Sequence, residues 1–498
     1  MAKTEPRLSD KELMERTLRD MPAFAAWSSL GMSRLLAASR LQWHARGGSL
    51  SDKDRAPEVL VLVSGSVLYA EPAAKGLGAG AAWTLLGTGL LLGLAHMVAL
   101  EDDLFEYFAN DDVVAIHIQG HLLFELLDSD AERWRDMGHM VISQDLKQGD
   151  LTSSQMAGRL SRRLAETIEK LAASHGTPNK ENGSIHLRLT QHDLAAMLRV
   201  SRQSVSKELA SLSISGAIQL KYNGILVLDP IALQRIARPP PVQPATQVAL
   251  RTGIGGRSAE ERVLMERTLR GKRAFLPWSS SAMKRLLDSS RLERHPRGAV
   301  VWTSLSGIAE YVFFISGHAS VGRVSPEGER FALLLFGPGD FSYIKQTRPT
   351  SLPMLHGSYD YIADSDVMSI HMPMTLILET LDSEPMLWKE ALLMSERQHA
   401  SYTQTVYRQV AGSLRQRLAS TIHRLAELHG VRAEKSESAT RLKVSQVSLA
   451  LLLQANRQAV NKELKALATT GAIELGYNGL TVLDRESLGR IAIRSLDS

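Results

Sequence analysis

The apolar residues follow helical spacing in two similar stretches of the chain. In each stretch four apolar side chains recur one helical turn apart, which predicts a helix with one buried face. They are Leu160, Leu164, Ile168 and Leu171 in the first stretch, and Leu414, Leu418, Ile422 and Leu425 in the second. The second set ends a helical pattern that runs from about 385 to 430, and the first set ends a similar one.

Strand patterns precede the second helical stretch. The segments AVVWTSLSGIAEYVFFISGHASVGRV (299–324) and RFALLLFGPGDFSYI (330–344) are β-branched and aromatic runs broken by Gly-containing turns. The apolar stretch TLLGTGLLLGLAHMVAL (84–100) is nearly long enough to cross a bilayer. Small residues interrupt it and acidic residues follow it, so we expect buried strands and turns there and no membrane partner.

The stretch from 189 to 229 predicts two short helices. Thr190 and Asp193 have the spacing of a capping box for the first helix. Ser201 is the expected N-cap of the second helix, and Gly216 the residue that ends it.

A hairpin follows these helices. The Asn-Gly pair at 223–224 predicts a tight turn between AIQL and ILVLD, because the central residues of such a turn take positive φ. Helix, turn, helix and hairpin make a winged helix-turn-helix, whose second helix presents its N-terminal end to the DNA major groove. Arg202 suits guanine, Gln203 suits adenine, and Lys207 suits a base or a phosphate.

The chain repeats itself. Residues 13–48 and 264–299 are identical at about six positions in ten. The winged-helix segment at 201–229 returns at 456–484 as NRQAVNKELKALATTGAIELGYNGLTVLD. We call residues 1–237 copy one and residues 261–498 copy two. The Pro- and Gly-rich linker between them could reach roughly 65 Å if extended.

These patterns predict an α+β chain in which each copy has a strand-rich domain, a long helix and a winged helix. The expected boundaries are 1–130, 131–160 and 161–237 in copy one, 238–260 for the linker, and 261–384, 385–414 and 415–498 in copy two. The long helices at 131–160 and 385–414 are expected to pack together. The expected contacts are Met137, Met140 and Ile142 against Leu392, Met394 and Tyr402.

Composition narrows the function only a little. Of 498 residues, 44% are hydrophobic, so each domain can bury a core, and the net charge of +5 permits nucleic-acid binding without requiring it. The absence of cysteine excludes iron–sulfur clusters and cysteine zinc sites, and it fits a cytoplasmic protein. The charged N-terminus does not have the pattern of a secretory signal.

The sequence resembles the cyclic-AMP receptor protein family, the CRP/FNR regulators. SRQSVSKELASLSISGAI resembles the recognition helix of that family, and FISGHASVGRV with FGPGDF resembles its β-roll. The resemblance implies a jelly-roll-like sensor domain in each copy, degenerate in copy one, followed by a dimerisation helix and the winged helix. It also implies double-stranded DNA as the partner, with RNA polymerase as a further candidate.

The resemblance implies two sets of DNA contacts. The base-reading residues would be Arg202, Gln203, Lys207, Arg457, Gln458 and Lys462. Phosphate or base-edge contacts would come from Thr190, Gln191, Ser201, Ser204, Ser206, Ser445, Gln446, Asn456 and Asn461. Two departures leave the target sequence open: Arg199 and Gln454 occupy the place of the family's turn Gly, and Gln occupies that of its usual reading Glu.

The residues that hold a cyclic nucleotide in this family are missing. GDFSYIKQ in copy two has no Glu after the turn, the Arg-Ser place reads near Leu355-His356, and copy one has neither residue. Loss of the Arg removes a charge-assisted pair with the phosphate. We therefore expect no cyclic-AMP dependence, and the effector is unknown. GPGD at 337–340 is expected to be a turn and not a phosphate loop.

Enzymatic and metal sites find no support in the sequence. His44, His96, His295 and His356 show no pairing at ligand spacing beside a carboxylate, so no metal or cofactor is expected. No catalytic residue is assigned and an enzyme is not expected.

Two function hypotheses remain. The first is a sequence-specific transcriptional regulator, in which one chain acts as an internal dimer on a pseudo-palindromic or asymmetric site, as a monomer with an internal pseudo-two-fold axis. The second is a small-molecule-sensing or protein-binding scaffold of the same fold whose winged helices no longer bind DNA.

Overall fold

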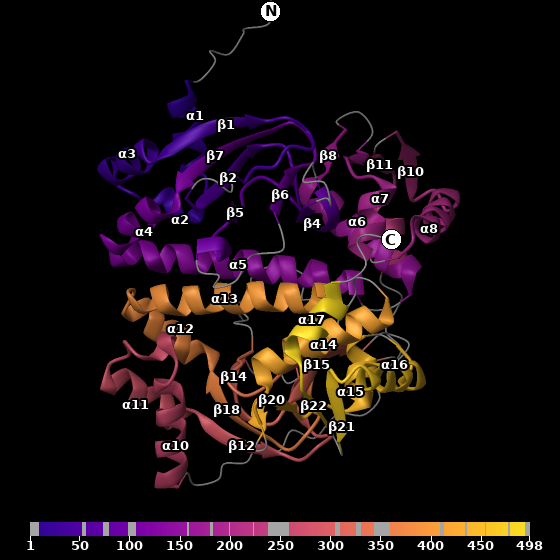
Figure 1. Ribbon diagram of the computed structural model, residues 1–498. Helices are drawn as coiled ribbons and strands as arrows, with labels where there is room; N and C mark the ends of the chain where they lie inside the picture. Colours follow the sequence, from indigo (N-terminus) through magenta and orange to yellow (C-terminus); the bar gives the residue numbers. More distant parts are fainter. Residues whose placement is uncertain are drawn as a thin grey trace, which may run out of the picture. The chain divides into compact units, whose positions relative to one another are not determined.

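The computed structural model describes residues 9–493 with internal gaps. The gaps are 52–55, 73–78, 98–105, 157–158, 180–182, 199, 223, 238–257, 304–308, 325–329, 343–358, 409–412, 434–435, 454 and 477–478. The chain forms two compact units (Figure 1). Unit 1 contains residues 1–155, 159–238 and 381–400, and unit 2 contains residues 156–158, 239–380 and 401–498.

Copy one begins with short helices and two antiparallel sheets, as the α+β prediction requires. The helices are α1 (Asp10–Arg19), α2 (Pro22–Ala25) and α3 (Ser29–Ala37). The first sheet has the order β1 (Ser39–His44), β7 (Val113–Gln119), β2 (Glu58–Ser64), β5 (Leu91–Leu92); the second has the order β4 (Ala79–Leu86), β3 (Val67–Pro72), β6 (Glu106–Ala109). Their apolar side chains share one core, which includes Leu62, Val67 and Leu92.

Helices and a third, small sheet complete copy one. The helices are α4 (Gly120–Asp128), α5 (Ala131–Met156), α6 (Leu160–His175), α7 (Gln191–Leu198), α8 (Arg202–Ile214) and α9 (Pro230–Ala237). The sheet has the order β10 (Ile218–Lys221), β11 (Gly224–Val227), β9 (Ile185–Leu187), β8 (Thr177–Pro178).

Copy two repeats this arrangement. Its helices are α10 (Ala259–Arg270), α11 (Ser280–Ser289), α12 (Met374–Ser383), α13 (Leu387–Arg408), α14 (Leu414–His429), α15 (Gln446–Leu452), α16 (Arg457–Thr469) and α17 (Arg485–Ile493). Its sheets run β12 (Arg291–His295), β18 (Val367–Pro373), β14 (Glu310–Ser316); β13 (Val300–Thr303), β17 (Tyr359–Ala363), β15 (Ala319–Val324), β16 (Arg330–Phe336); and β19 (Val431–Ala433), β20 (Ser436–Leu442), β22 (Gly479–Val482), β21 (Ile473–Gly476).

The helical pattern from about 385 to 430 is formed by two helices, α13 and α14, close to the expected domain boundary at 414. Ser413 is the N-cap of the second helix, which begins at Leu414. Ser413 and Gln416 form a capping box, so this polar signal outweighs the continuous apolar pattern. Leu418, Ile422 and Leu425 are buried in the core as expected.

The apolar stretch at 84–100 forms strands and turns where it is described. It contributes the end of β4, the short strand β5 and a 3₁₀ turn at Ala95–Met97. Among the described residues, no helix combines the length and the apolar content that a membrane span requires.

Within unit 1, α5 packs against the first part of α13, which comes from copy two (Figure 1). Trp388 is fully buried, and a Cβ on Gly138 would lie 2.3 Å from its ring. Only glycine therefore allows α5 to approach Trp388 this closely. Met137, Met140, Ile142 and Leu392 are buried as expected. Tyr402 lies in unit 2 against Phe336 of β16, with ring centroids 5.4 Å apart.

Polar contacts flank this packing. Asp128 accepts a hydrogen bond from the Trp134 indole at 3.0 Å, and Lys389 pairs with the same carboxylate at 2.7 Å. Asp382 likewise accepts from the Trp388 indole at 3.1 Å, and His139 Nε2 lies 2.7 Å from it. Each copy thus supplies an Asp–Trp pair and a side chain that reaches the other copy's aspartate.

Two carboxyl groups and an imidazole lie further along the same helices. His399 Nδ1 is 3.8 Å from the Asp145 carboxylate, and Oε1 of the buried Glu396 has no hydrogen-bond partner among the described residues. Burial raises the pKa of Glu396, and the charge of Asp145 raises it further, while His399 opposes the rise. Burial also raises the pKa of Asp145 and lowers that of His399.

This cluster predicts a stability that falls at alkaline pH. Because the folded-state pKa of each carboxyl is raised, the stability it contributes is complete below its unfolded pKa and is lost as pH rises through the folded value. The melting temperature of Glu396→Gln is therefore expected to equal that of the native chain at about pH 5 and to exceed it at about pH 9. Thermal unfolding followed by circular dichroism across this range tests it.

Glu125→Gln is the control, since Glu125 is an exposed residue of α4 in the same unit. It should shift the melting temperature equally at both pH values. The assignment is wrong if the Glu396→Gln and native curves run parallel over the whole range.

Candidate nucleic-acid interface

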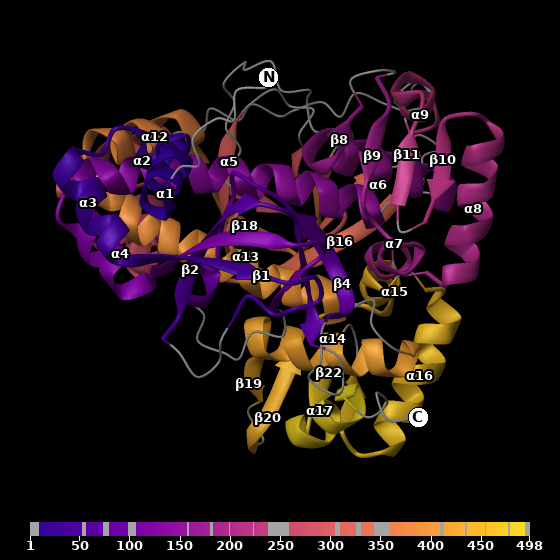
Figure 2. The same cartoon turned by 90° about the horizontal axis from the view of Figure 1, so that it is seen from above.

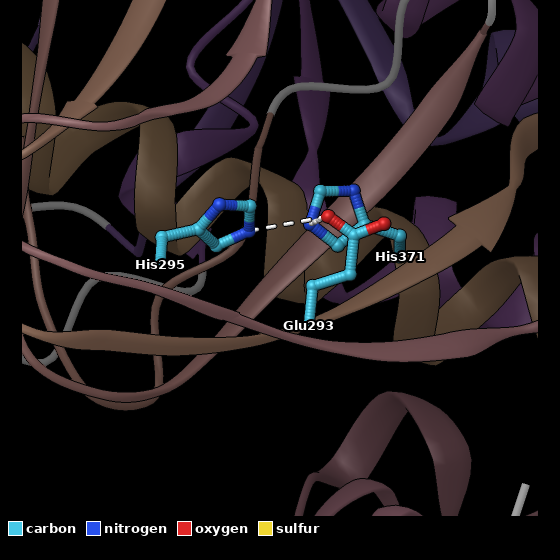
Figure 3. Close-up of side chains that lie close together, drawn as sticks. All are labelled: Glu293, His295 and His371. Atoms are coloured by element: carbon cyan, nitrogen blue, oxygen red, sulfur yellow. Dashed lines mark ion pairs between the residues drawn. The ribbon is translucent and has the colours of Figure 1, made fainter. Parts of the chain in front are cut away.

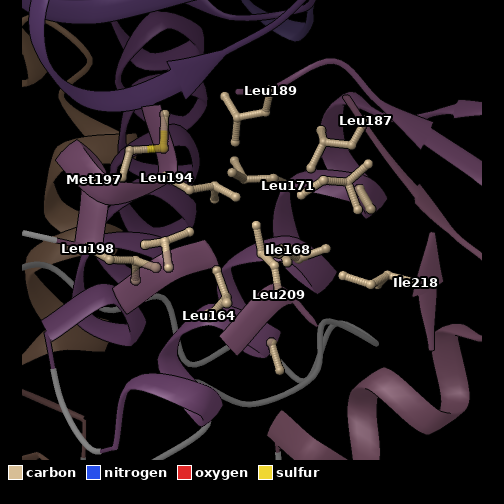
Figure 4. Close-up of a cluster of buried hydrophobic side chains, with 14 of the residues drawn as sticks. Leu164, Ile168, Leu171, Leu187, Leu189, Leu194, Met197, Leu198, Leu209 and Ile218 are labelled. Atoms are coloured by element: carbon tan, nitrogen blue, oxygen red, sulfur yellow. The ribbon is translucent and has the colours of Figure 1, made fainter. Parts of the chain in front are cut away.

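A single apolar core holds the copy one winged helix together. Helix α6 contributes Leu164, Ile168 and Leu171, which lie among side chains of α7, α8 and the small sheet (Figure 4). Val205, Leu209 and Leu212 of α8 are buried in the same core, as the sequence pattern predicts. The opposite face of α8 is therefore left exposed.

The N-terminal end of α8 presents the predicted base-reading residues. The Ser201 side chain caps the helix by accepting a hydrogen bond from the Ser204 amide at 3.1 Å. Arg202, Gln203 and Lys207 are exposed beyond this cap. A rigid helix start with three exposed polar side chains matches the geometry with which winged helices enter a major groove.

Helix α7 begins with the predicted capping box. The Asp193 amide donates to the Thr190 hydroxyl at 3.1 Å, and the Thr190 amide donates to the Asp193 carboxylate at 3.0 Å. The Thr190 oxygen is thus already used within the helix. Any phosphate contact at this end would rely on the remaining backbone N–H groups and on the half-buried Gln191.

The hairpin differs from the prediction. Gly224 is the first residue of β11 and pairs with Lys221, so it does not lie at the centre of the turn; Asn223 lies outside the described residues. A Cβ on Gly224 would lie 2.7 Å from Nε2 of His186 and 3.0 Å from the Leu187 carbonyl oxygen. Glycine is needed here because β9 packs closely, not because the backbone requires positive φ. Gly216, by contrast, ends α8 with φ +77° as predicted.

The hairpin and the two helices enclose a hollow of about 400 Å³. Its lining brings the start of α7, with Thr190 and Gln191, together with Arg202 of α8 and with Lys221 and Tyr222 of the hairpin. Figure 2 shows α7, α8, β10 and β11 in this arrangement. Sequence reasoning missed Lys221 and Tyr222, although a cation next to an aromatic residue is a recognisable signal for nucleic-acid contact. In the structure the Tyr222 side chain is 96% exposed.

We call the exposed N-terminal end of α8, or of α16 in copy two, the reading head of that copy. The head of copy two has the same arrangement as that of copy one but different capping residues. Asn456 caps α16 by accepting from the Ala459 amide at 2.7 Å, and Ser445 caps α15 by accepting from the Ser448 amide at 3.0 Å. Arg457, Gln458 and Lys462 are exposed, as their counterparts are in copy one.

Two further details distinguish the heads. The Gln446 side chain donates to Asn461 at 3.3 Å, so these two predicted contact residues bind each other. Copy two has Gly476 at the position of Lys221, and its hairpin therefore lacks that cation. The DNA-contact roles of the predicted residues stay predictions, as do the turn positions 199 and 454, which lie outside the described residues.

These two domains define a class of protein, the DNA-binding winged-helix proteins. The model of the Crp-like helix-turn-helix domain matches residues 158–236 and 416–491. The two matches show that each copy of the duplicated chain contains a Crp-like helix-turn-helix domain. The chain is a transcriptional regulator with two DNA-binding domains.

Solved structures of single-copy length are similar to parts of the chain. A CRP-family transcriptional regulator from Thermus thermophilus is 20% identical, with 40% of this chain and 96% of that chain covered and a TM-score of 0.32. A CooA mutant from Carboxydothermus hydrogenoformans is 16% identical, with 43% of this chain and 91% of that chain covered and a TM-score of 0.33. FixK2 from Bradyrhizobium japonicum is 15% identical, with 41% of this chain and 96% of that chain covered and a TM-score of 0.33. No curated protein is significantly similar to the chain.

The hollow predicts a sequence-independent role for Lys221. Lys221→Ala should weaken binding by a similar factor on all duplexes and lower the salt slope of log K by about one, because one phosphate contact is lost. Fluorescence anisotropy at several salt concentrations measures both quantities. Lys11→Ala, which removes an equal charge from the exposed face of α1, should leave the slope unchanged. A change of sequence preference in Lys221→Ala would contradict a phosphate contact.

Proposed function

We propose that one chain binds one operator with both of its winged helices, as an internal dimer, and that this binding needs no cyclic AMP. The observation that carries the proposal is the presence of two exposed reading heads in one polypeptide, each with the same Arg-Gln pair and the same Lys. CRP-type helix-turn-helix proteins bind as dimers whose half-sites lie one helical turn of DNA apart, and this chain supplies both heads itself.

The packing of α5 supports an internal dimer. Residues 381–400 of copy two belong to the compact unit formed by copy one, where Trp388 lies against Gly138. The covalent link raises the effective concentration of one copy near the other to the millimolar range, on the order of that of short flexible linkers. One chain per operator is the stoichiometry that follows.

The differences between the heads favour unequal half-sites. Ser201, Ser204 and Ser206 of copy one correspond to Asn456, Ala459 and Asn461 in copy two. Hydroxyl, amide and methyl groups make different contacts with base edges. The shared Arg, Gln and Lys would read the common part of a pseudo-palindrome, and the divergent positions would make it asymmetric.

Independence of cyclic AMP rests on the sequence. In copy two the family's Glu place falls in GDFSYIKQ (339–346) and its Arg-Ser place near Leu355-His356, and residues 343–358 lie outside the described residues. In copy one the corresponding region reads TGLLLGLAHM (88–97). These segments provide neither the ribose-binding Glu nor the phosphate-binding Arg at the family's positions. RNA polymerase and an effector of another kind remain candidate partners.

Single substitutions in the two heads test the internal dimer. Arg202→Ala and Arg457→Ala should each cost about 1–3 kcal/mol and relax one half-site only, because a bidentate contact with one base is lost. Selection of operators from a random duplex library, followed by footprinting, shows which half-site loses its preference. The native footprint should cover roughly 20–25 base pairs at one chain per duplex.

Two outcomes would overturn this arrangement. If each substitution blurred both half-sites equally, every operator would contain both kinds of head from separate chains. If the native chain bound no duplex from the library, the protein would be a scaffold of the same fold that no longer reads DNA.

Cyclic AMP is tested separately. We expect the operator affinity of the native chain to change less than about twofold with saturating cyclic AMP, measured by anisotropy at fixed salt. A gain of about tenfold, which equals about 1.4 kcal/mol, would contradict independence of the nucleotide. A cyclic-AMP-dependent regulator assayed in parallel confirms that the nucleotide is active.

A further inference from the structure

Strands β12, β18 and β14 of copy two place a group of polar side chains on one face of their sheet. Glu293 pairs in register with Ser369, and Arg291 pairs with His371. Because side chains alternate along a strand, Glu293 and His295 point to the same side of β12. His371 of β18 joins them, as Figure 3 shows. The three side chains thus converge although 78 residues separate the first from the last in sequence.

The distances among these side chains match a metal site. Nε2 of His295 lies 3.2 Å from Oε2 of Glu293, and Nε2 of His371 lies 3.7 Å from the same oxygen. The three ligand atoms all lie within 4.8 Å of one another. Ligand atoms held about 2.0–2.1 Å from a tetrahedral zinc ion are about 3.3–3.4 Å apart, so only small side-chain shifts would be needed.

The second ring nitrogen of His371 is oriented as in known metal sites. His371 Nδ1 lies 3.2 Å from the Glu310 carboxylate, which Arg291 also holds at 2.8 Å. A hydrogen donated from Nδ1 leaves the Nε2 lone pair directed at Glu293, and such carboxylate–histidine pairs orient and strengthen metal ligands. Nε2 of His295 is buried and makes no hydrogen bond of good geometry among the described residues.

Glu293 is the one carboxylate among the three ligands, and its two oxygens have different partners. Arg291 binds Oε1, so Oε2 is left to face the two imidazoles. The hydroxyl of Ser369 lies 3.1 Å from Nε2 of His371, where it can hydrogen-bond a water in a fourth ligand position.

Copy one contains the same arrangement without the third ligand. Gln42 replaces Glu293, and Ala115 replaces Ser369 as its partner in register. His44 and His117 bind each other directly, with their Nε2 atoms 3.0 Å apart, while Glu58 still contacts Nδ1 of His117 at 2.9 Å. The neutral amide and the closed imidazole pair leave no three-ligand site there.

We propose that Glu293, His295 and His371 bind one divalent transition-metal cation of the zinc class, in copy two only. Two imidazoles and one carboxylate suit Zn²⁺ and its neighbours, whereas Mg²⁺ and Ca²⁺ prefer sets of oxygen ligands. The ion joins the edge strand β12 to the central strand β18 and thereby stabilises the β-roll of unit 2.

Titration of the full chain with Zn²⁺ after chelator treatment tests the site. We expect one tight equivalent in calorimetry, and an X-ray absorption edge with nitrogen and oxygen ligands and no sulfur. Glu293→Gln, which gives copy two the residue of copy one, should weaken this equivalent by more than about 100-fold. His44→Gln in copy one is the matched control and should leave the affinity and stoichiometry unchanged.

Stability supplies the second measurement. Zn²⁺ should raise the melting temperature of the native chain and of His44→Gln, but not that of Glu293→Gln. Without metal, Glu293→Gln must melt as a folded protein, and His295→Gln provides an independent loss of a ligand if it does not. The proposal is overturned if the native chain binds no tight equivalent, or if Glu293→Gln and His295→Gln bind it as well as the native chain does.

Discussion

The close contact between Trp388 of copy two and Gly138 of copy one is the interaction on which the packing of α13 against α5 depends. It places a segment of copy two inside the compact unit formed by copy one. A fully buried large apolar side chain is worth about 1.5–3 kcal/mol, and Trp388 exposes none of its surface. Because the approach to α5 requires a residue without a side chain, the contact is specific as well as favourable.

The polar contacts around Trp388 are not symmetric between the two copies, which a duplicated chain allows and a homodimer does not. In a symmetric dimer, if residue i contacts residue j of the partner, then j also contacts i. Here Lys389 reaches Asp128, but Asp382 is reached by His139 and not by Arg135, the residue that corresponds to Lys389. Arg135 pairs instead with Glu132 and Asp136 of its own helix.

The contacts of the buried acids Asp145 and Glu396 also depart from two-fold symmetry. Asp145 and His399 occupy equivalent positions of the two copies, as do Ile142 and Glu396. A homodimer would bring two like residues together across a two-fold axis, whereas the fused chain brings a carboxylate within 3.8 Å of an imidazole. Fusion has thus removed the constraint of self-complementarity from this interface.

Local signals made much of the structure predictable from sequence. The Thr190–Asp193 capping box, the Ser201 cap and the end of α8 at Gly216 depend on residues within one or two turns. The role of Gly224 was mistaken because its neighbours, His186 and Leu187, come from another strand. No sequence spacing relates these positions, so only the fold could show why a side chain is excluded there.

The cluster around His371 was missed for the same reason. Glu293 and His295 lie two residues apart, but their partner on β18 is fixed by strand register. Sequence comparison of the copies does point to the cluster once the register is known, because Gln42 and Ala115 differ from Glu293 and Ser369 at paired positions.

The divergence of the copies is therefore spread over three kinds of surface. The heads differ at Lys221 and Gly476, the long helices differ at Asp145 and His399, and the rolls differ at Gln42 and Glu293. In a homodimer each change would appear twice and would have to suit both settings. In a single chain each change occurs once, so each winged helix can diverge by itself and the roll of copy two can carry Glu293 where copy one carries Gln42.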